Sequence, residues 1–161
     1  MSVRLEKASV EDAPRLWQMQ VRAFRPLLEK YQDGAANPAN ESLETVERRF
    51  SQSCTDYYLI LLDEAAVGGV RVIRRRDRRC NISPLFVVPE YQRRGIAQAA
   101  IRELEEIYPD VQWELNTILQ EKGNCRLYEK MGYRRTGELE QVNEHMTLVY
   151  YRKRRRSDFN Y

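Results

Sequence analysis

One short segment, Gln92-Arg93-Arg94-Gly95-Ile96-Ala97, combines residue types that bind phosphate groups. It follows an apolar stretch that ends at Pro89, and apolar residues recur after it at helical spacing. At the start of a helix, backbone N–H groups lack helical partners and the helix dipole adds partial positive charge. Gly95 removes side-chain obstruction, the two arginines add charge, and the small Ala97 lets a ligand lie close to the helix. The segment predicts a phosphate or pyrophosphate site, although an ordinary strand-to-helix turn with solvated arginines would have the same residues.

Hydrophobic periodicity predicts a mixed sheet with helices on its faces, which would hold this turn. The expected strands are 3–8, 57–62, 67–75, 81–88, 111–119, 134–140 and 146–152, and the expected helices are about 10–30, 41–52, 96–107 and 124–131. Strands and helices alternate only in the second half, and the consecutive strands from 57 to 88 indicate an antiparallel meander. Gly68-Gly69 within one strand indicates a bulge or a close backbone approach.

Length and charge limit the classes of function. A chain of 161 residues fits one domain, and we expect a domain over 1–153 with a basic, frayed tail at 154–161. The formal net charge is +3, but residues 152–161 hold five basic residues and one acidic residue, which leaves −1 for residues 1–151. The body is therefore close to neutral, so nucleic acid is an unlikely partner.

Cysteine and histidine usage argues against metal sites and a secreted location. Three cysteines lie at wide spacings without a C-x-x-C pair, and His145 is the single histidine, so we expect no zinc site. The N-terminus is too charged for a signal peptide, and no apolar run is long enough to span a bilayer. These features predict a cytoplasmic protein with free thiols and no membrane partner.

Two segments resemble the GNAT superfamily of acyl-CoA-dependent N-acetyltransferases. Residues 85–97, Leu-Phe-Val-Val-Pro-Glu-Tyr-Gln-Arg-Arg-Gly-Ile-Ala, are similar to the family's acetyl-CoA motif R/Q-x-x-G-x-G/A. Residues 127–133, Leu-Tyr-Glu-Lys-Met-Gly-Tyr, are similar to its L-Y-E-K-x-G-F/Y segment, and the likeness extends from Val3 to about Lys153. The resemblance implies a mostly antiparallel twisted sheet of about seven strands with a splayed strand 4 and strand 5 pair, flanked by about four helices.

The resemblance also implies acetyl-CoA as co-substrate and assigns residues to it. Backbone groups of Phe86, Val87 and Val88 should pair with the pantetheine arm, and an N–H near Val87 should polarise the thioester carbonyl. A bulge should splay this strand from 111–119 and open a V for the cofactor. The cofactor-binding residues expected from the family are Phe86, Val87, Val88, Gln92, Arg93, Arg94, Gly95, Ile96, Ala97, Asn124 and Tyr128.

The implied reaction is direct attack of a neutral amine on the thioester through a tetrahedral intermediate. Tyr128 occupies the family's general-acid position, although its ring could merely pack on the sheet. The base is less defined, because Asn81 and Asn116 stand where the family often has carboxylates. Glu114 shares a strand face with Asn116 and is the leading candidate, while Glu90 and a water chain held by the two asparagines are alternatives.

Other positions concern cofactor and acceptor contacts. The family often has Asn where Glu121 stands here, so Asn124 is expected both to contact CoA and to cap the short helix. The acceptor should lie between the first two helices and the closing hairpin, near Asn81 and Asn116. Tyr31 and Asp33, in a polar loop there, could receive a cationic amine, or the loop could be a solvated connector.

Three functions remain open from the sequence. The first is acetylation of a small-molecule primary amine, and the second is acetylation of a protein N-terminus or lysine. The third is a non-catalytic CoA-binding or RNA-associated module that would use the basic runs at 74–79 and in the tail. A homodimer is possible by analogy with similar folds.

Overall fold

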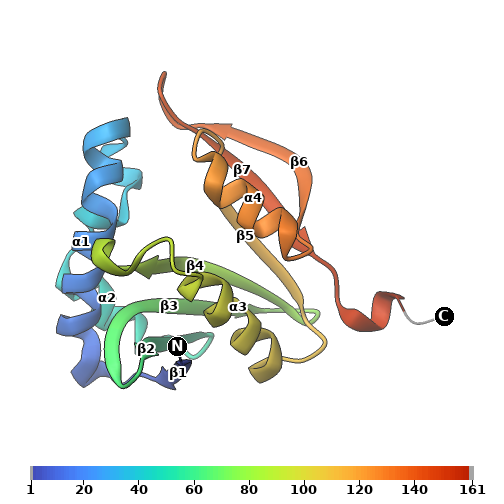
Figure 1. Cartoon of the computed structure of the whole chain (residues 1–161), viewed down its shortest axis with the longest axis horizontal. Helices are drawn as coiled ribbons and strands as arrows, with labels where there is room; N and C mark the ends of the chain where they lie inside the picture. The colour runs from blue at the N-terminus through green and yellow to red at the C-terminus, as the bar shows by residue number, and fades with distance from the viewer. Residues whose placement is uncertain (1, 160–161) are drawn as a thin grey trace.

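The computed structural model describes residues 2–159, and in them the chain forms seven strands and four α-helices (Figure 1). The strands are β1 (Val3–Lys7), β2 (Thr55–Leu62), β3 (Ala65–Arg75), β4 (Arg79–Val87), β5 (Gln112–Ile118), β6 (Arg134–Gln141) and β7 (Thr147–Lys153). The helices are α1 (Ala13–Tyr31), α2 (Leu43–Arg49), α3 (Ile96–Ile107) and α4 (Lys122–Lys130). This order of elements agrees with the predicted one.

The sheet has the order β1-β2-β3-β4-β5-β7-β6 and is antiparallel except between β4 and β5. These two strands pair only from Arg79↔Gln112 to Asn81↔Glu114, although β4 continues to Val87 and β5 to Ile118. Beyond the last pair the strands diverge, so a V opens toward their carboxyl ends (Figure 1). The predicted splay of strand 4 from strand 5 is therefore confirmed.

A bulge in β4 lies directly after the last β4–β5 pair. Val70 pairs with Leu85 and Val72 pairs with Ile82, so one intervening residue on β3 opposes Ser83 and Pro84 on β4. The extra residue bends β4 away from β5, which is the usual effect of a bulge. A second irregularity opposite Ile60 and Leu61 lies beside Gly68, where an added Cβ would come within 2.1 Å of the Phe86 carbonyl oxygen. Both interpretations of the Gly68-Gly69 pair, bulge and close approach, hold.

Helices cover both faces of the sheet. Leu16 of α1 and Val46 of α2 share one buried cluster with Phe86 and Val88 of β4. On the opposite face, the buried side chains of α3 and α4 pack against β4, β5 and β7. Because side chains alternate along a strand, Val87 points to the α3 face while its two neighbours point to the α1 face.

Two helix starts differ from the expected ones. Helix α2 begins at Leu43 because the Ser42 side chain accepts a hydrogen bond from the Thr45 N–H and caps it. Helix α4 begins at Lys122, with Glu121 as its N-cap residue, so Asn124 lies inside the helix. The prediction that Asn124 caps this helix is wrong.

The tail after β7 forms a short 3-10 turn at Arg156–Phe159, and the Ser157 N–H donates to Asp110 at 3.1 Å. Residues 160–161 lie outside the described part, and fraying of 154–161 stays a prediction. Over residues 2–159, no helix has the length and apolar character that crossing a bilayer requires.

Candidate active site

The turn before α3 has the geometry of an anion site. Arg93 and Gly95 adopt left-handed backbone conformations with φ of 62° and 77°. A Cβ added at Gly95 would meet nothing within 4 Å, so the space above the turn is open. The first amide to bond back into the helix is that of Ala99, which donates to Gly95 at 3.0 Å. The N–H groups of residues 96–98 therefore have no helical partners and are available to a phosphate.

Glu90 fixes this turn to α1. Its two carboxylate oxygens accept from the Arg22 guanidinium at 2.5 and 2.7 Å. The hydrogen bond from Arg22 holds the pKa of Glu90 below its usual range. A carboxylate in this state is a weaker base, so the geometry assigns Glu90 to positioning and gives the alternative of Glu90 as base no support.

Only alternate residues of β4 direct their backbone N–H and carbonyl groups toward β5 and the V. The Val88 N–H donates to the Val67 carbonyl at 2.9 Å, and its carbonyl accepts from the Tyr91 N–H at 3.0 Å. In an antiparallel ladder this pattern also turns the backbone groups of Phe86 toward β3. The expectation that Phe86 and Val88 pair with the pantetheine arm is therefore corrected.

Val87 is the residue whose N–H and carbonyl point into the V, and Leu85 follows the same alternation two residues earlier. The Gln92 side chain donates to the Val87 carbonyl at 2.8 Å and ties the turn to the strand. Strand alternation was the sequence signal that could have identified Leu85, in place of Phe86 and Val88, as a second residue with backbone groups at this edge. The Val87 N–H is left as a donor toward the space between β4 and β5.

Tyr128 lies on α4, with its ring centroid 5.8 Å from that of Tyr133 and 6.1 Å from that of Tyr151. Its hydroxyl makes no hydrogen bond to any residue within 2–159. Every buried side-chain N or O atom in this range has a hydrogen-bond partner, so the Tyr128 hydroxyl oxygen must be accessible from outside. Burial raises the pKa of Tyr128 to about 12. The packing interpretation and the acid interpretation are thus compatible, because the ring packs while the hydroxyl stays protonated and free.

On the face away from α3, a cavity of about 300 Å³ lies over β4, β5 and β7. The structure brings together Asn81, Glu114 and Asn116 in its lining, as strand alternation predicts. The cavity includes the Asn81↔Glu114 pair, the last pair before the two strands separate. This face therefore offers an acceptor space at the apex of the V.

Glu114 is already engaged. Arg79 donates to its carboxylate oxygens through Nε at 3.0 Å and through Nη2 at 3.4 Å. Arg152 lies opposite Glu114 in the β5–β7 register. Glu114 would have to leave Arg79 before it could accept a proton from an amine.

Tyr31 and Asp33, which were expected at the acceptor site, make contacts within the protein instead. Tyr31 is buried, and its hydroxyl donates to the Glu121 carboxylate, which also accepts from Lys30 at 2.8 Å. Asp33 is buried and accepts from the Asn37 amide at 2.9 and 3.2 Å. The interpretation of Asp33 as a receptor for a cationic amine is corrected, because its carboxylate braces its own loop.

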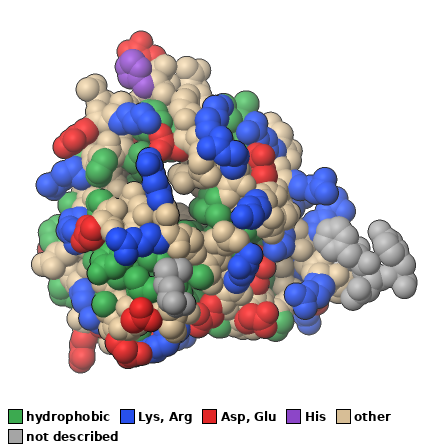
Figure 2. Space-filling view, in the orientation of Figure 1, with side chains coloured by type: hydrophobic (Ala, Val, Ile, Leu, Met, Phe, Trp, Pro, Cys, Tyr) green, Lys and Arg blue, Asp and Glu red, His purple; other side chains and the backbone are tan. Residues whose placement is uncertain are grey.

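Two further residues expected to bind the cofactor, Arg93 and Asn124, lie on the turn before α3 and on α4. Burial raises the pKa of Glu121, but Lys30, Tyr31 and, less strongly, Arg93 lower it below its usual range, so the turn before α3 lies near the start of α4. Asn124 is exposed on α4, and its CoA contact stays a prediction. Figure 2 shows a hollow near the middle of this view, with basic side chains on both sides of it. Across the described residues, no cluster of metal-binding side chains was found.

Comparisons with known proteins give one consistent result. The profile of the acetyltransferase (GNAT) family matches residues 15–133. A curated protein of Bacillus subtilis, the uncharacterized protein YrkN, is 31% identical over 97% of this chain and 84% of its own length. Among solved structures, the ribosomal-protein-S18-alanine N-acetyltransferase from Escherichia coli has a TM-score of 0.75 at 14% identity, covering 94% of this chain and 93% of its own. The spermidine N-acetyltransferase from Vibrio cholerae, solved with CoA and spermine, has a TM-score of 0.74 at 15% identity and covers 93% and 94%.

Proposed function

The chain belongs to the acetyltransferase (GNAT) family, and from this premise we propose that it transfers an acetyl group from acetyl-CoA to a small-molecule primary amine. The observation that carries the proposal is the V between β4 and β5, with the Val87 N–H directed into it. A narrow thiol ester can enter such a gap from the α3 side and meet an amine that enters from the acceptor cavity.

The residues at the V suit acetyl-CoA. The Val87 N–H can pair with the pantetheine arm as an added strand would, and the unpartnered amides at the start of α3 suit a pyrophosphate. Arg93 and Arg94 are exposed beside these amides and add positive charge. The open space above Gly95 leaves room for the ligand.

The reaction needs an oxyanion donor and a proton for the leaving thiolate. A β4 amide at the free edge, Val87 or Leu85, donates to the thioester oxygen as negative charge develops on it. Tyr128 donates its hydroxyl proton toward sulfur as the carbon–sulfur bond breaks. The proton balance closes because the amine nitrogen loses one proton while the thiolate gains one.

Removal of the amine proton is assigned to water held by Asn81 and Asn116. Both amides line the acceptor cavity, and neither can act as a base itself. Glu114 is the second candidate, with the added cost of separating it from Arg79. The two candidates predict different pH profiles.

The direct test measures CoA thiol release from acetyl-CoA with a panel of primary amines, together with the melting temperature of the protein. We expect acetyl-CoA to raise the melting temperature and at least one amine to be acetylated. A melting temperature unchanged at millimolar acetyl-CoA would contradict the cofactor assignment. A raised melting temperature without any acetylation would favour the non-catalytic CoA-binding alternative.

A further inference from the structure

Two arginines of β3 donate hydrogen bonds to β4 at its last pair with β5 and directly after it, and Arg75 also lines the acceptor cavity. Arg75 Nε donates to the Asn81 side-chain oxygen at 2.6 Å, and Arg71 Nε donates to the Ser83 carbonyl. Asn81 is the last β4 residue that pairs with β5, and Ser83 begins the bulge. We infer that Arg71 and Arg75 select an acceptor whose primary amine is accompanied by a carboxylate, as in a free amino acid.

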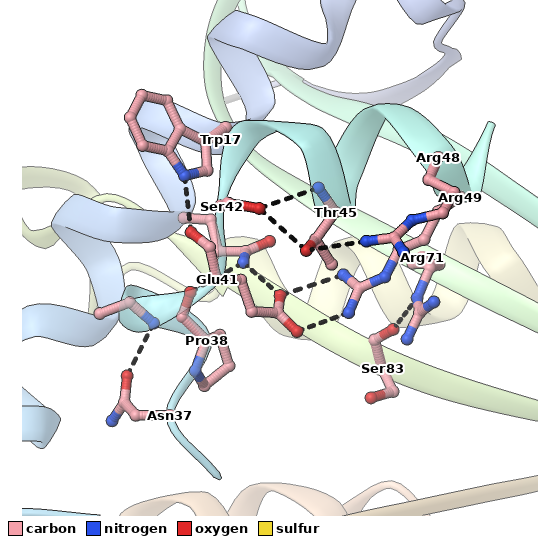
Figure 3. A network of polar contacts seen from close by, with 12 residues as sticks. Trp17, Asn37, Pro38, Glu41, Ser42, Thr45, Arg48, Arg49, Arg71 and Ser83 are labelled. Atoms are coloured by element: carbon pink, nitrogen blue, oxygen red, sulfur yellow. Dashed lines mark hydrogen bonds and ion pairs between the residues drawn. The ribbon is translucent and has the colours of Figure 1, made fainter. Parts of the chain in front are cut away.

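Neither guanidinium forms an ion pair with a carboxylate among residues 2–159. Figure 3 shows Arg49 between Glu41 and Arg71, and the Glu41 carboxylate is bound by Arg49, with one contact of 3.0 Å. Because Arg49 binds this acid, the Ser83 carbonyl is the one acceptor of the Arg71 guanidinium within the described residues. Burial, together with the neighbouring Arg49, lowers the pKa of Arg71, as expected for a cation without its own anion.

The cavity that Arg75 lines also has an excess of cations over acids. Glu114 is neutralised by Arg79. Arg75 and Arg152 also line the cavity, and neither forms an ion pair with a residue in the described range. Glu138 of β6 is the remaining acid of the lining. The apex therefore holds more positive charge than the surrounding acids compensate.

This charge pattern fits a carboxylate and opposes a polycation. A guanidinium presents parallel N–H donors that match the two oxygens of a carboxylate, and each Arg has donors left after its bond to β4. Nearby cations also disfavour the ammonium form of the acceptor, so that the water held by Asn81 and Asn116 removes its proton more readily. A polyamine would meet these arginines with its own positive charges. The inference rests on the proposed acetyl transfer and names its acceptor class.

The test compares free amino acids with their α-carboxamides and with spermidine, using full-length protein, saturating acetyl-CoA and thiol release. We expect kcat/KM for a free amino acid to exceed that for its carboxamide by about tenfold or more. Arg75→Gln should lower kcat/KM for the acid about tenfold more than that for the amide, mainly through KM. Arg75 is exposed, so this variant should fold, and Arg71→Gln is a second variant whose melting temperature is checked first.

Arg76→Gln is the matched control, because Arg76 is an exposed arginine at the β3–β4 turn without a described partner. It removes the same charge and should keep the preference for the acid. Equal or better turnover of carboxamides or spermidine by the unaltered protein would overturn the inference and leave the proposed acetyl transfer standing. Thiol release with none of these amines would overturn both.

Discussion

At the residue scale, the proposed chemistry depends on two donors that face the V from different elements. The Val87 N–H is free because its neighbours' backbone groups are bound to β3, and the Tyr128 hydroxyl is free because no described side chain reaches it. Both donors are held by packing, Val87 in the cluster under α3 and Tyr128 against two other tyrosine rings. Fixed donors of this kind need little reorganisation during reaction.

Replacement of Tyr128 by phenylalanine separates its proton from its packing. We expect Tyr128→Phe to lower kcat by roughly a hundredfold or more, with little change in acetyl-CoA affinity or melting temperature. Tyr128 has a pKa of about 12, so its deprotonation should not limit the unaltered enzyme near neutral pH. Tyr133→Phe is the control, since it removes a neighbouring hydroxyl that points to Glu105 at 3.4 Å. An unchanged kcat in Tyr128→Phe would remove the acid role.

The pH profile of Glu114→Gln tests the source of the base. Because Arg79 holds both carboxylate oxygens, we expect the profile of kcat/KM to keep its shape in Glu114→Gln. Loss of the rise in rate on the acidic side of the profile would instead identify Glu114 as the base. Glu90→Gln serves as a control, because its carboxylate is held by Arg22 outside the cavity.

At the element scale, the connection from β4 to α3 determines where the cofactor can bind. The bulge at Ser83–Pro84 separates β4 from β5, and Gln92 links the following turn to Val87. Arg22 and Glu90 attach the same turn to α1. The strand edge and the helix start are therefore held in one geometry by contacts that do not involve the ligand.

Two glycine replacements separate backbone strain from helix propensity. Gly95→Ala places a side chain at a φ of 77°, so we expect a loss of about 1 kcal/mol in the free energy of unfolding and a higher KM for acetyl-CoA. Gly123→Ala is the matched control, because it lies in α4 with open space around its Cα, and should be neutral or slightly stabilising. Urea unfolding and steady-state kinetics measure both effects. Equal behaviour of the two variants would contradict the role of the Gly95 conformation.

Much of this geometry follows from sequence pattern, and the exceptions have local causes. Periodicity predicted the elements, and alternation placed Glu114 and Asn116 on one face. The pairing of Val88 with Val67 depends on the β3–β4 register, which motif spacing does not specify. Asp33 points inward because the Asn37 side chain donates a hydrogen bond to it and closes the loop. The amino-acid composition of this loop does not determine that conformation.

At the scale of the whole molecule, the basic runs are largely structural. Arg74 pairs with Asp56, Arg78 with Asp110 and Arg79 with Glu114, so three of the five arginines in the 74–79 run form ion pairs within the fold. An isolated patch for a polyanion would keep these side chains free. The contacts weaken the RNA-associated alternative and explain why a near-neutral body carries a dense arginine hairpin.

The two parts of the molecule on either side of the V are also joined at its open end. Tyr31 at the end of α1 donates to Glu121 at the start of α4, and its carbonyl accepts from the Asn143 side chain at 2.9 Å. Sheet pairing between the two parts is limited to three residue pairs of β4 and β5. The Tyr31 contacts therefore reinforce, at the open end of the V, a connection that the shared apolar core also provides.

Removal of the Tyr31 hydroxyl should loosen this connection. A hydrogen bond to a charged acceptor contributes about 1.5–3 kcal/mol, so we expect Tyr31→Phe to lower the free energy of unfolding by roughly 1–2 kcal/mol and to raise the KM for acetyl-CoA. Hydrogen exchange should increase in β5, α4 and the β6–β7 hairpin more than in β1–β3. Tyr150→Phe makes the same chemical change at an exposed contact with Glu140, and its stability loss should be smaller. Equal losses in the two variants, or uniform exchange across the sheet, would show that the Tyr31 hydroxyl does not join the two parts, and the width of the V would then depend on the β4–β5 pairs and the shared apolar core.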